Sequence, residues 1–418
     1  MKKLVISGGR PLGGSVDLQG SKNSALPILS AAVAVDGISV IHNCPDLTDV
    51  TAALKILEHI GCIIKREGHT VIIDATTACR CEIPENLMRE MRSSIVFLGA
   101  LLARFGRASV TSPGGCEIGL RPIDLHLCSL RKMGVRICEA GGSLECFVPN
   151  GICGCRISLA FPSVGATENI MLASMGASGE TLITNAAREP EIADLADFLN
   201  KCGAEIIGAG QSVMRIRGCK KLRSAEHTII SDRIVASTFM ACAASAGGKI
   251  AVRGVLAEHL SSVISVFEAA GCEMRFNRDE LVFKAPKRIS RVKSIRTMPY
   301  PGFPTDSQAV VMAMLSKAQG TSVIAEKIFE NRFRHVPELI KMGADISVED
   351  CCLAVVEGVE NLHGARVSAG DLRGGCALVV AAVGAEGETV ISEIHHIDRG
   401  CESFETSLSE LGADIKRE

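Results

Sequence analysis

The sequence is poor in aromatic residues and has no long apolar run. It contains no tryptophan, one tyrosine and 3% aromatic residues in total, so recognition of nucleic-acid bases by aromatic stacking is not expected. The longest apolar run covers residues 95–103, far short of the roughly 18 residues needed to span a bilayer. The N-terminal MKKLVISGGR lacks the apolar stretch of about 7–15 residues typical of a signal peptide. These absences predict a cytoplasmic protein that binds neither membrane nor nucleic acid.

Neither sign of charge dominates, and the cysteines have no metal-binding spacing. The 45 basic and 47 acidic residues give a net charge of −2 and form no polybasic segment, so any anion site must be built locally. None of the 18 cysteines forms a C-x-x-C motif. We therefore expect most of them to be buried, reduced side chains, without a structural metal or a disulfide framework.

An internal repeat is the strongest organisational feature of the chain. The pattern of an apolar helix end, a glycine and a short strand occurs six times, as HIGCII, KMGVRI, KCGAEI, AAGCEM, KMGADI and ELGADI, with the glycines 68 to 73 residues apart. The glycine suits the left-handed residue that ends a helix. Apolar helices of small residues share the same period and begin near Lys22, Arg92, Gly165, Asp232, Asp306 and Arg373.

Each unit therefore reads helix, strand, loop, helix, glycine and strand. The alternating strands predict sheets with one face buried, and the apolar helices are expected to be buried on all sides. Six units exceed one core, so we expect two similar α/β (α+β) domains of three units each. Their predicted bounds are 22–230, and 231–418 completed by the N-terminal strand 1–21, with chain crossings near 21 and 231 acting as a hinge.

Charged residues and one asparagine gather at the predicted starts of the central helices. They are Lys22, Asn23, Arg92, Asp232, Asp306, Asp371 and Arg373. Helix N-termini favour phosphate, and cations are poor choices there for stability. Convergence of these helices would make an anion-binding cleft. The alternative is a scaffold with ordinary helix caps, for which Ser21, Asp232 and Thr305 are candidates.

The segment 112–122, SPGGCEIGLRP, replaces a simple connection in the second unit. Its glycines and prolines are typical of a lid. Cys116 lies in this loop five residues before Arg121, where a nearby cation favours the thiolate. These residues alone fit a reactive cysteine and an inert loop cysteine equally well.

Nine segments, taken together, resemble the motifs of the UDP-N-acetylglucosamine 1-carboxyvinyltransferases, an enolpyruvyl transferase family. They are SKNSALPIL, MRSSIVFLGALLARFG, PGGCEIG followed by RPIDLH, SVGATENI, NAAREPEI, FPTDSQA, FENRFRHVPEL, DLRGG and HHIDRG, and they occur in the family's order over the whole chain. The resemblance implies an inside-out α/β barrel type of fold, with sheets around buried helices. The enolpyruvyl transferase of the shikimate pathway shares the six-unit fold but lacks the PGGC loop.

The resemblance implies that phosphoenolpyruvate and UDP-N-acetylglucosamine are the substrates. Lys22, Arg121 and Arg399 match the family's contacts to the phosphate, and Arg332 and Arg373 match its contacts to the carboxylate. Guanidinium groups suit both anions because they pair with them in a bidentate manner.

The acceptor sugar is expected near Asn23 and Asp306, which match residues that hold its 3-hydroxyl. His126 is an additional candidate, although a buried structural histidine explains it equally well. The remaining positions that match nucleotide-sugar contacts are Arg92, Arg121, Pro122, Ile123, Asp124, Leu125, Ser163, Val164, Gly165 and Ile328.

The implied reaction is an addition followed by an elimination, in the first committed step of peptidoglycan precursor synthesis. The sugar 3-hydroxyl attacks C2 of phosphoenolpyruvate, and the tetrahedral intermediate loses phosphate. Cys116 is the candidate acid for C3, Asp306 the candidate base, and Lys22 a catalytic cation. This chemistry requires no metal or organic cofactor.

The chain departs from the family's common pattern beside the DLR motif, where Gly374, Gly375 and Cys376 replace small residues other than cysteine. Two other functions stay open from the sequence. One is an enolpyruvyl transferase for another acceptor, such as shikimate 3-phosphate. The other is a non-catalytic paralogue that binds the nucleotide sugar, against which the intact set of charged residues argues. The sequence leaves the oligomeric state undetermined.

Overall fold

The computed structural model describes residues 2–111, 113–114, 119, 122–219 and 221–418. The chain forms two compact units. The C-unit consists of residues 2–19, 119 and 231–418, and the N-unit of the described residues of 20–114 and 122–230. The chain passes between the units after Gln19 and after Ile230.

The N-unit contains three repeats. Its elements are α1 (Lys22–Ala32), β3 (Ile38–His42), α2 (Thr48–Ile60), β4 (Ile63–Glu67), β5 (Thr70–Asp74), α3 (Glu85–Glu90), η1 (Arg92–Val96), α4 (Phe97–Phe105), β6 (Arg107–Thr111), α5 (Asp124–Lys132), β7 (Arg136–Ala140), β8 (Ser143–Phe147), β9 (Ile152–Cys153), β10 (Arg156–Ser158), α6 (Val164–Ser174), β11 (Ala177–Ser178), β12 (Glu180–Thr184), α7 (Pro190–Lys201), β13 (Glu205–Ile207), β14 (Val213–Arg217) and β15 (Ala225–Thr228).

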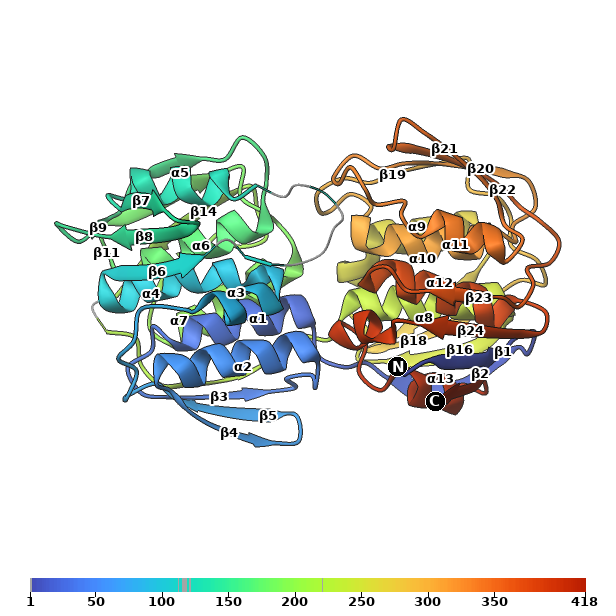
Figure 1. Cartoon of the computed structure of the whole chain (residues 1–418), viewed down its shortest axis with the longest axis horizontal. Helices are drawn as coiled ribbons and strands as arrows, with labels where there is room; N and C mark the ends of the chain where they lie inside the picture. Colours follow the sequence, from blue (N-terminus) through green and yellow to red (C-terminus); the bar gives the residue numbers. More distant parts are fainter. Residues whose placement is uncertain (1, 112, 115–118, 120–121, 220) are drawn as a thin grey trace. The chain divides into compact units, whose positions relative to one another are not determined.

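The C-unit contains the other three repeats and the first two strands of the chain (Figure 1). Its elements are β1 (Leu4–Ser7), β2 (Leu12–Asp17), α8 (Arg233–Ala246), β16 (Gly248–Arg253), η2 (Ala257–Leu260), α9 (Ser261–Ala269), β17 (Glu273–Asn277), β18 (Glu280–Lys284), β19 (Ser294–Arg296), α10 (Thr305–Leu315), β20 (Thr321–Ala325), α11 (Val336–Lys341), β21 (Asp345–Glu349), β22 (Leu353–Glu357), β23 (Arg366–Ser368), α12 (Leu372–Gly384), β24 (Glu388–Ser392), η3 (Ile394–Arg399), α13 (Phe404–Glu410) and β25 (Asp414–Arg417).

One sheet pattern recurs in the repeats. In the first, β5 lies between β3 and β4 and is antiparallel to both, and β15 joins β3 in parallel. The sequence predicted the strand after each glycine but missed the returning strand that forms this hairpin. In the sixth repeat the strand in the position of the returning strand comes from the start of the chain. There β1 takes the central place between β24 and β25.

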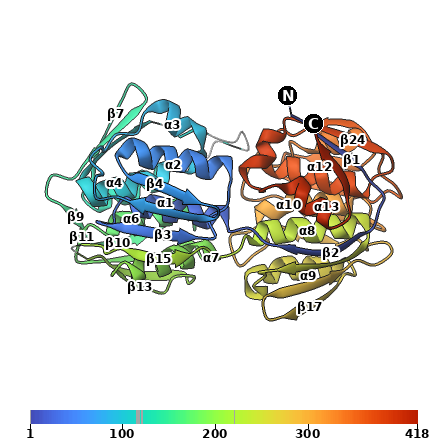
Figure 2. The ribbon, with the colours of Figure 1, turned by 90° about the horizontal axis from the view of Figure 1, so that it is seen from below.

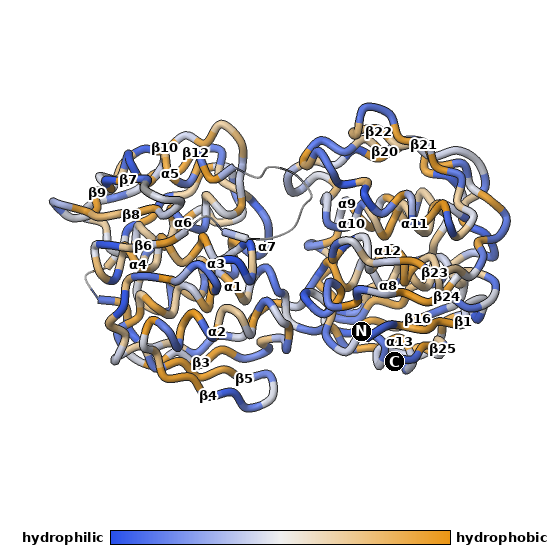
Figure 3. The backbone as a smooth tube through the Cα atoms, viewed as in Figure 1, coloured by the Kyte–Doolittle hydropathy of each residue, from blue (hydrophilic) through white to orange (hydrophobic). Residues whose placement is uncertain are grey.

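The central helix of each repeat is buried, as the sequence predicted. In the C-unit α8, α10 and α12 pack against one another, and both views show them side by side (Figures 1 and 2). They are hydrophobic along most of their length (Figure 3). In the N-unit α4 packs against α1 and α6. Amphipathic helices such as α2 and α7 bury one side. Burial of the central helices fixes where their polar ends lie.

The helix ends follow the sequence in most respects. All six repeat glycines have positive φ values, between 88° and 106°. Asp232 caps α8, with its Oδ1 accepting hydrogen bonds from the backbone of Ile234 and Val235 at 2.9 and 3.1 Å. Ser21 precedes α1 without a side-chain cap bond. Thr305 is not a cap, because α10 already begins at that residue.

The far ends of the C-unit helices converge on Lys317. Its Nζ donates to the carbonyl of Ser245, near the end of α8, at 3.1 Å and to that of Gly384, the last residue of α12, at 2.5 Å. Lys317 itself lies two residues after α10. Helix C-termini carry unsatisfied carbonyls and partial negative charge. One ammonium group therefore stabilises the ends of α8 and α12, and it is supplied by the residue that follows α10.

We expect Lys317→Met to lower the free energy of unfolding of the C-unit by about 3–6 kcal/mol, because it removes two hydrogen bonds from a charged donor, each worth ~1.5–3 kcal/mol. The side-chain stem is kept, so packing changes little. Denaturant unfolding followed by circular dichroism measures the loss. Lys341→Met is the matched control, since its surface pair with Glu338 is worth about 0–1 kcal/mol. Equal losses in both variants would contradict this role for Lys317.

Candidate active site

Asp306 lies between two buried arginines at the start of α10. Its Oδ1 accepts a hydrogen bond from Nη2 of Arg332 at 2.9 Å and another from Nε of Arg373 at 3.0 Å. The side chains of Arg332 and Arg373 are 3% and 8% exposed, while that of Asp306 is 33% exposed. Two guanidinium groups favour the ionised carboxylate. An anionic oxygen is thus held in place by two cations and still reaches the surface of its unit.

Arg373 is charged in spite of its burial. Burial by itself lowers the pKa of Arg373, but Asp306 and then Asp232 more than offset it and raise that pKa. Asp232 caps α8, Asp306 is in the first turn of α10, and Arg373 is in the first turn of α12. The predicted convergence of helix starts is therefore present in the C-unit. Arg373 contacts Asp306 and interacts electrostatically with Asp232, so the charged side chains at the starts of three helices lie together.

Glu326 lies next to this cluster and holds the segments that carry Arg332 and Asp306. Its buried carboxylate accepts four hydrogen bonds. Oε1 accepts from the Thr297 hydroxyl at 2.9 Å and from the backbone N–H groups of Ile328 at 2.8 Å and Phe329 at 3.2 Å. Oε2 accepts from the Thr305 hydroxyl at 3.0 Å. Since the Thr305 carbonyl in turn accepts from Arg332, Glu326 fixes the loop after β20 against the start of α10.

Arg399 is half-buried at the end of η3, which packs against α12. Asp371 caps α12, its Oδ1 accepting from the backbone of Arg373 at 3.0 Å and Gly374 at 3.1 Å. Next to this cap, burial lowers the pKa of His335 to about 4, an effect that Asp371 opposes and Arg332 adds to. His335 is therefore neutral at neutral pH, and the positive charge in this region comes from arginine.

In the N-unit, Lys22 opens α1 and its Nζ donates to Oδ2 of Asp49 at 3.2 Å. A second buried group holds the same turn of helix. Asp194 accepts a hydrogen bond from the Ser24 hydroxyl and contacts His227 Nε2 at 2.9 Å. Asp194 and His227 are both buried. The start of α1 is thus fixed from two sides, which orients Lys22 and Asn23.

A buried amide joins the other helix starts of the N-unit. Asn169 Nδ2 donates to His126 Nδ1 at 2.8 Å and to the Ile95 carbonyl at 2.9 Å, and its Oδ1 accepts from Gly99 at 2.7 Å. α5, η1 and α6 are therefore linked through one side chain. A Cβ atom on Gly165 would lie 3.0 Å from the His126 ring, so a side chain at this position would crowd the ring and glycine favours the close approach of the two helices.

His126 is therefore held in a structural network, and it lies against the first turn of α6. The guanidinium of Arg92 donates to the Pro113 carbonyl at 3.2 Å. The other described residues expected to contact the nucleotide are at helix starts or in loops and are mostly exposed or half-buried: Pro122, Ile123, Asp124, Leu125, Ser163, Val164, Gly165 and Ile328. Cys116 and Arg121 lie outside the described residues.

Sequence analysis missed Glu326, Asn169 and Asp49. The available signal for Glu326 was an acidic residue directly after the alternating strand TSVIA. Most cysteines were expected to be buried, but only eight of the 17 described ones are. The others are exposed or half-buried because they lie in loops, on the outward faces of strands or, for Cys128, on the exposed side of helix α5. Among the described residues, no group of histidines, cysteines or carboxylates has the arrangement of a metal site. No described helix has both the length and the apolar character to cross a membrane.

Comparison with known proteins agrees with the resemblance predicted from the sequence. Residues 6–408 match the family described as EPSP synthase (3-phosphoshikimate 1-carboxyvinyltransferase). Two UDP-N-acetylglucosamine 1-carboxyvinyltransferases are similar over the whole chain. The protein of that name with the number 2 from Caldanaerobacter subterraneus is 52% identical, covering 100% of both chains. The protein from Trichlorobacter lovleyi is 49% identical, covering 100% of this chain and 99% of its own.

Among solved structures, the enolpyruvyl transferase NikO from Streptomyces tendae superposes with a TM-score of 0.90 at 25% identity, covering 100% of this chain and 98% of that one. The mixed α/β fold class predicted from the sequence is thereby confirmed. The full-length identity and the matching family profile together show that the chain belongs to the enolpyruvyl transferase family, among the UDP-N-acetylglucosamine 1-carboxyvinyltransferases.

Proposed function

We propose that the protein transfers the enolpyruvyl group of phosphoenolpyruvate to the 3-hydroxyl of UDP-N-acetylglucosamine and releases phosphate. The observation that carries the proposal is the Asp306 carboxylate held between Arg332 and Arg373 at converging helix starts. Asp306 can act as a base, and the two arginines beside it suit the carboxylate of phosphoenolpyruvate. The names of the full-length relatives support the same substrates. The reaction belongs to peptidoglycan precursor synthesis, and we infer a cytoplasmic location from it.

The residues divide the work as follows. Asp306 takes the proton of the sugar 3-hydroxyl while the oxygen of that hydroxyl attacks C2 of phosphoenolpyruvate. Cys116 gives a proton to C3. Loss of phosphate and of a C3 proton completes the transfer. Arg332 and Arg373 hold the carboxylate, whereas Lys22, Arg121 and Arg399 hold the phosphate. Asn23 orients the acceptor sugar. The residues that contact the uridine diphosphate part of the substrate are Arg92, Arg121, Pro122, Ile123, Asp124, Leu125, Ser163, Val164, Gly165 and Ile328.

Release of inorganic phosphate tests the proposal. Phosphoenolpyruvate is supplied with UDP-N-acetylglucosamine, with shikimate 3-phosphate, or with neither. Rapid release is expected only with the nucleotide sugar. Release with shikimate 3-phosphate would assign another acceptor, and no release with either acceptor, together with calorimetric binding of UDP-N-acetylglucosamine, would identify a non-catalytic paralogue.

Lys22→Ala and Arg399→Ala are expected to raise KM for phosphoenolpyruvate about 10–100-fold, because each removes a charge-assisted contact worth ~1.5–3 kcal/mol. Calorimetric binding of UDP-N-acetylglucosamine should change little. Since Lys22 also contacts Asp49, circular dichroism checks the fold of that variant. Nucleotide-sugar binding that collapses in both variants would show that these cations do not act on phosphoenolpyruvate.

Glu326→Ala should lower kcat/KM for phosphoenolpyruvate about 100-fold, because displacements of about 1 Å at a site cost this much. Glu326→Gln should recover most of the activity, since the amide oxygen still accepts the three bonds made by Oε1. Glu357→Ala is the matched control, because Glu357 also accepts a threonine hydroxyl, but on the surface. If Gln gave no recovery while the fold stayed intact, positioning through these hydrogen bonds would be wrong.

A further inference from the structure

Two cysteines lie in contact behind the arginines of the candidate site. The Sγ atoms of Cys376 and Cys401 are 3.5 Å apart, and both side chains are buried, at 1% and 2% exposure. Cys376 is in the first turns of α12, three residues after Arg373. Cys401 is two residues after Arg399, just beyond η3. The pair thus connects the two segments that carry these guanidinium groups.

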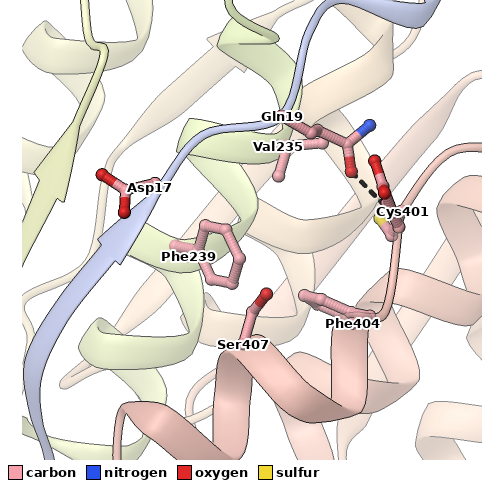
Figure 4. Close-up of a pocket in the computed structure, with 8 residues that line it drawn as sticks. Asp17, Gln19, Val235, Phe239, Cys401, Phe404 and Ser407 are labelled. Carbon is pink, nitrogen blue, oxygen red and sulfur yellow. Dashed lines mark hydrogen bonds between the residues drawn. The ribbon is translucent and has the colours of Figure 1, made fainter. Parts of the chain in front are cut away.

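Cys401 also borders a small cavity of about 20 Å³, lined further by Gln19, Val235, Phe239 and Phe404 (Figure 4). This is space for about one water-sized molecule. Gln19 holds the backbone on both sides of Cys401. Its Nε2 donates to the Gly400 carbonyl at 3.1 Å, and its Oε1 accepts from the Glu402 N–H at 2.7 Å. A small reagent therefore has a space beside the Cys401 sulfur, and the segment around Cys401 is fixed by a defined clamp.

We propose that Cys376 and Cys401 form a reversible disulfide that weakens the use of phosphoenolpyruvate when the protein is oxidised. The second half of this proposal rests on the proposed function. The oxidant is a small hydroperoxide such as hydrogen peroxide. The Cys401 sulfur attacks one peroxide oxygen, the O–O bond breaks, and a sulfenic acid and water form. The Cys376 sulfur then displaces the hydroxyl as a second water, so that two thiols and one peroxide give one disulfide and two waters.

Closing the bond displaces the segments that carry the arginines. A disulfide requires a sulfur separation of about 2.05 Å, so the two sulfurs must approach by roughly 1.5 Å. Because Gln19 holds the backbone on both sides of Cys401, we expect part of this approach to be made by α12, which carries Cys376 and Arg373. Displacements of about 1 Å at a site cost up to about 100-fold in rate. The expected result is weaker binding of phosphoenolpyruvate.

The environment of the pair sets the speed of the response. The hydrogen bond with Cys376 and burial raise the pKa of Cys401 well above its usual value, and Arg373 opposes them only in part. Since the thiolate is the reacting form, oxidation is slow at neutral pH and responds to sustained exposure to peroxide. A dithiol such as dithiothreitol supplies the two electrons and two protons that restore both thiols.

The test compares the wild type with Cys401→Ser and Cys376→Ala, so that either variant serves if the other folds poorly. Each protein is incubated with hydrogen peroxide at pH 7 and pH 9, blocked with an alkylating reagent and digested without reduction. Mass mapping should find the peptides of Cys376 and Cys401 joined in the wild type alone. In the wild type, KM for phosphoenolpyruvate should rise at least about tenfold and return with dithiothreitol. All three proteins keep Cys116, so its oxidation lowers kcat equally in all.

Each outcome decides the proposal. Absence of the joined peptide at both pH values would overturn the disulfide. A joined peptide with an unchanged KM would overturn its effect on the site. If the reduced protein showed no turnover, the proposed function would fail while mass mapping still reported the disulfide, and calorimetric binding of phosphoenolpyruvate before and after oxidation would report its effect.

Discussion

Cys116→Ala is expected to lower kcat by about 10²–10⁴-fold, the range that a positioned acid or base contributes. Cys116→Asp should retain part of the turnover, because a carboxylic acid also donates a proton. A small phosphonate epoxide should alkylate Cys116 in the wild type and fail to inactivate the Asp variant. The reason is the sequence around Cys116, a glycine-rich loop with Arg121 five residues on, in a chain whose other candidate residues attract phosphate.

The remaining cysteines provide the controls for this experiment. Cys153 is exposed and lies on the short strand β9, so Cys153→Ala should keep full activity and full sensitivity to the epoxide. Peptide mass mapping after brief treatment identifies the alkylated residue. Labelling at Cys79 or Cys153 ahead of Cys116, or full activity of Cys116→Ala, would remove Cys116 from the reaction.

Much of the fold was predictable because the repeat is defined by short-range sequence features. A left-handed glycine ends a helix, and a run of small apolar residues makes a helix that must be buried. Both features are short-range, and all six copies agree. The returning strands β5, β8, β14, β18 and β22 were missed although buried and more exposed residues alternate along each of them. The repeat was located by its helices and glycines, and neither feature marks a strand that follows its neighbour through a short turn. The central place of β1 in the last sheet depends on the whole chain, and no local pattern encodes it.

The candidate site was predictable only in part. The resemblance supplied Asp306, Arg332 and Arg373, and the structure brings them into contact across 26 and 67 residues of sequence. Glu326 could not be inferred, because an acidic residue at the end of a strand is normally solvated. It is buried here because the following loop folds back over it and saturates its oxygens. The contact of Cys376 with Cys401 also joins distant segments, and spacing alone does not indicate it.

Asp306→Asn should separate binding from catalysis. The asparagine oxygen still accepts hydrogen bonds from Arg332 and Arg373, so the geometry is kept, but the amide is not a base. We expect kcat to fall about 10²–10⁴-fold. KM for phosphoenolpyruvate should stay equal or decrease, because two buried guanidinium groups lose a competing anion and attract the substrate carboxylate more strongly.

Steady-state kinetics with both substrates measures this split. Asp345→Asn makes the same chemical change on the exposed face of β21 and should leave both constants unchanged. Asp306→Ala is the second arm. Without any acceptor between them, Arg332 and Arg373 are no longer held in place, so this variant should lose kcat and also bind phosphoenolpyruvate less well than Asp306→Asn. If Asn and Ala raised KM equally, with kcat preserved, Asp306 would serve to orient the arginines and another group would take the proton of the 3-hydroxyl.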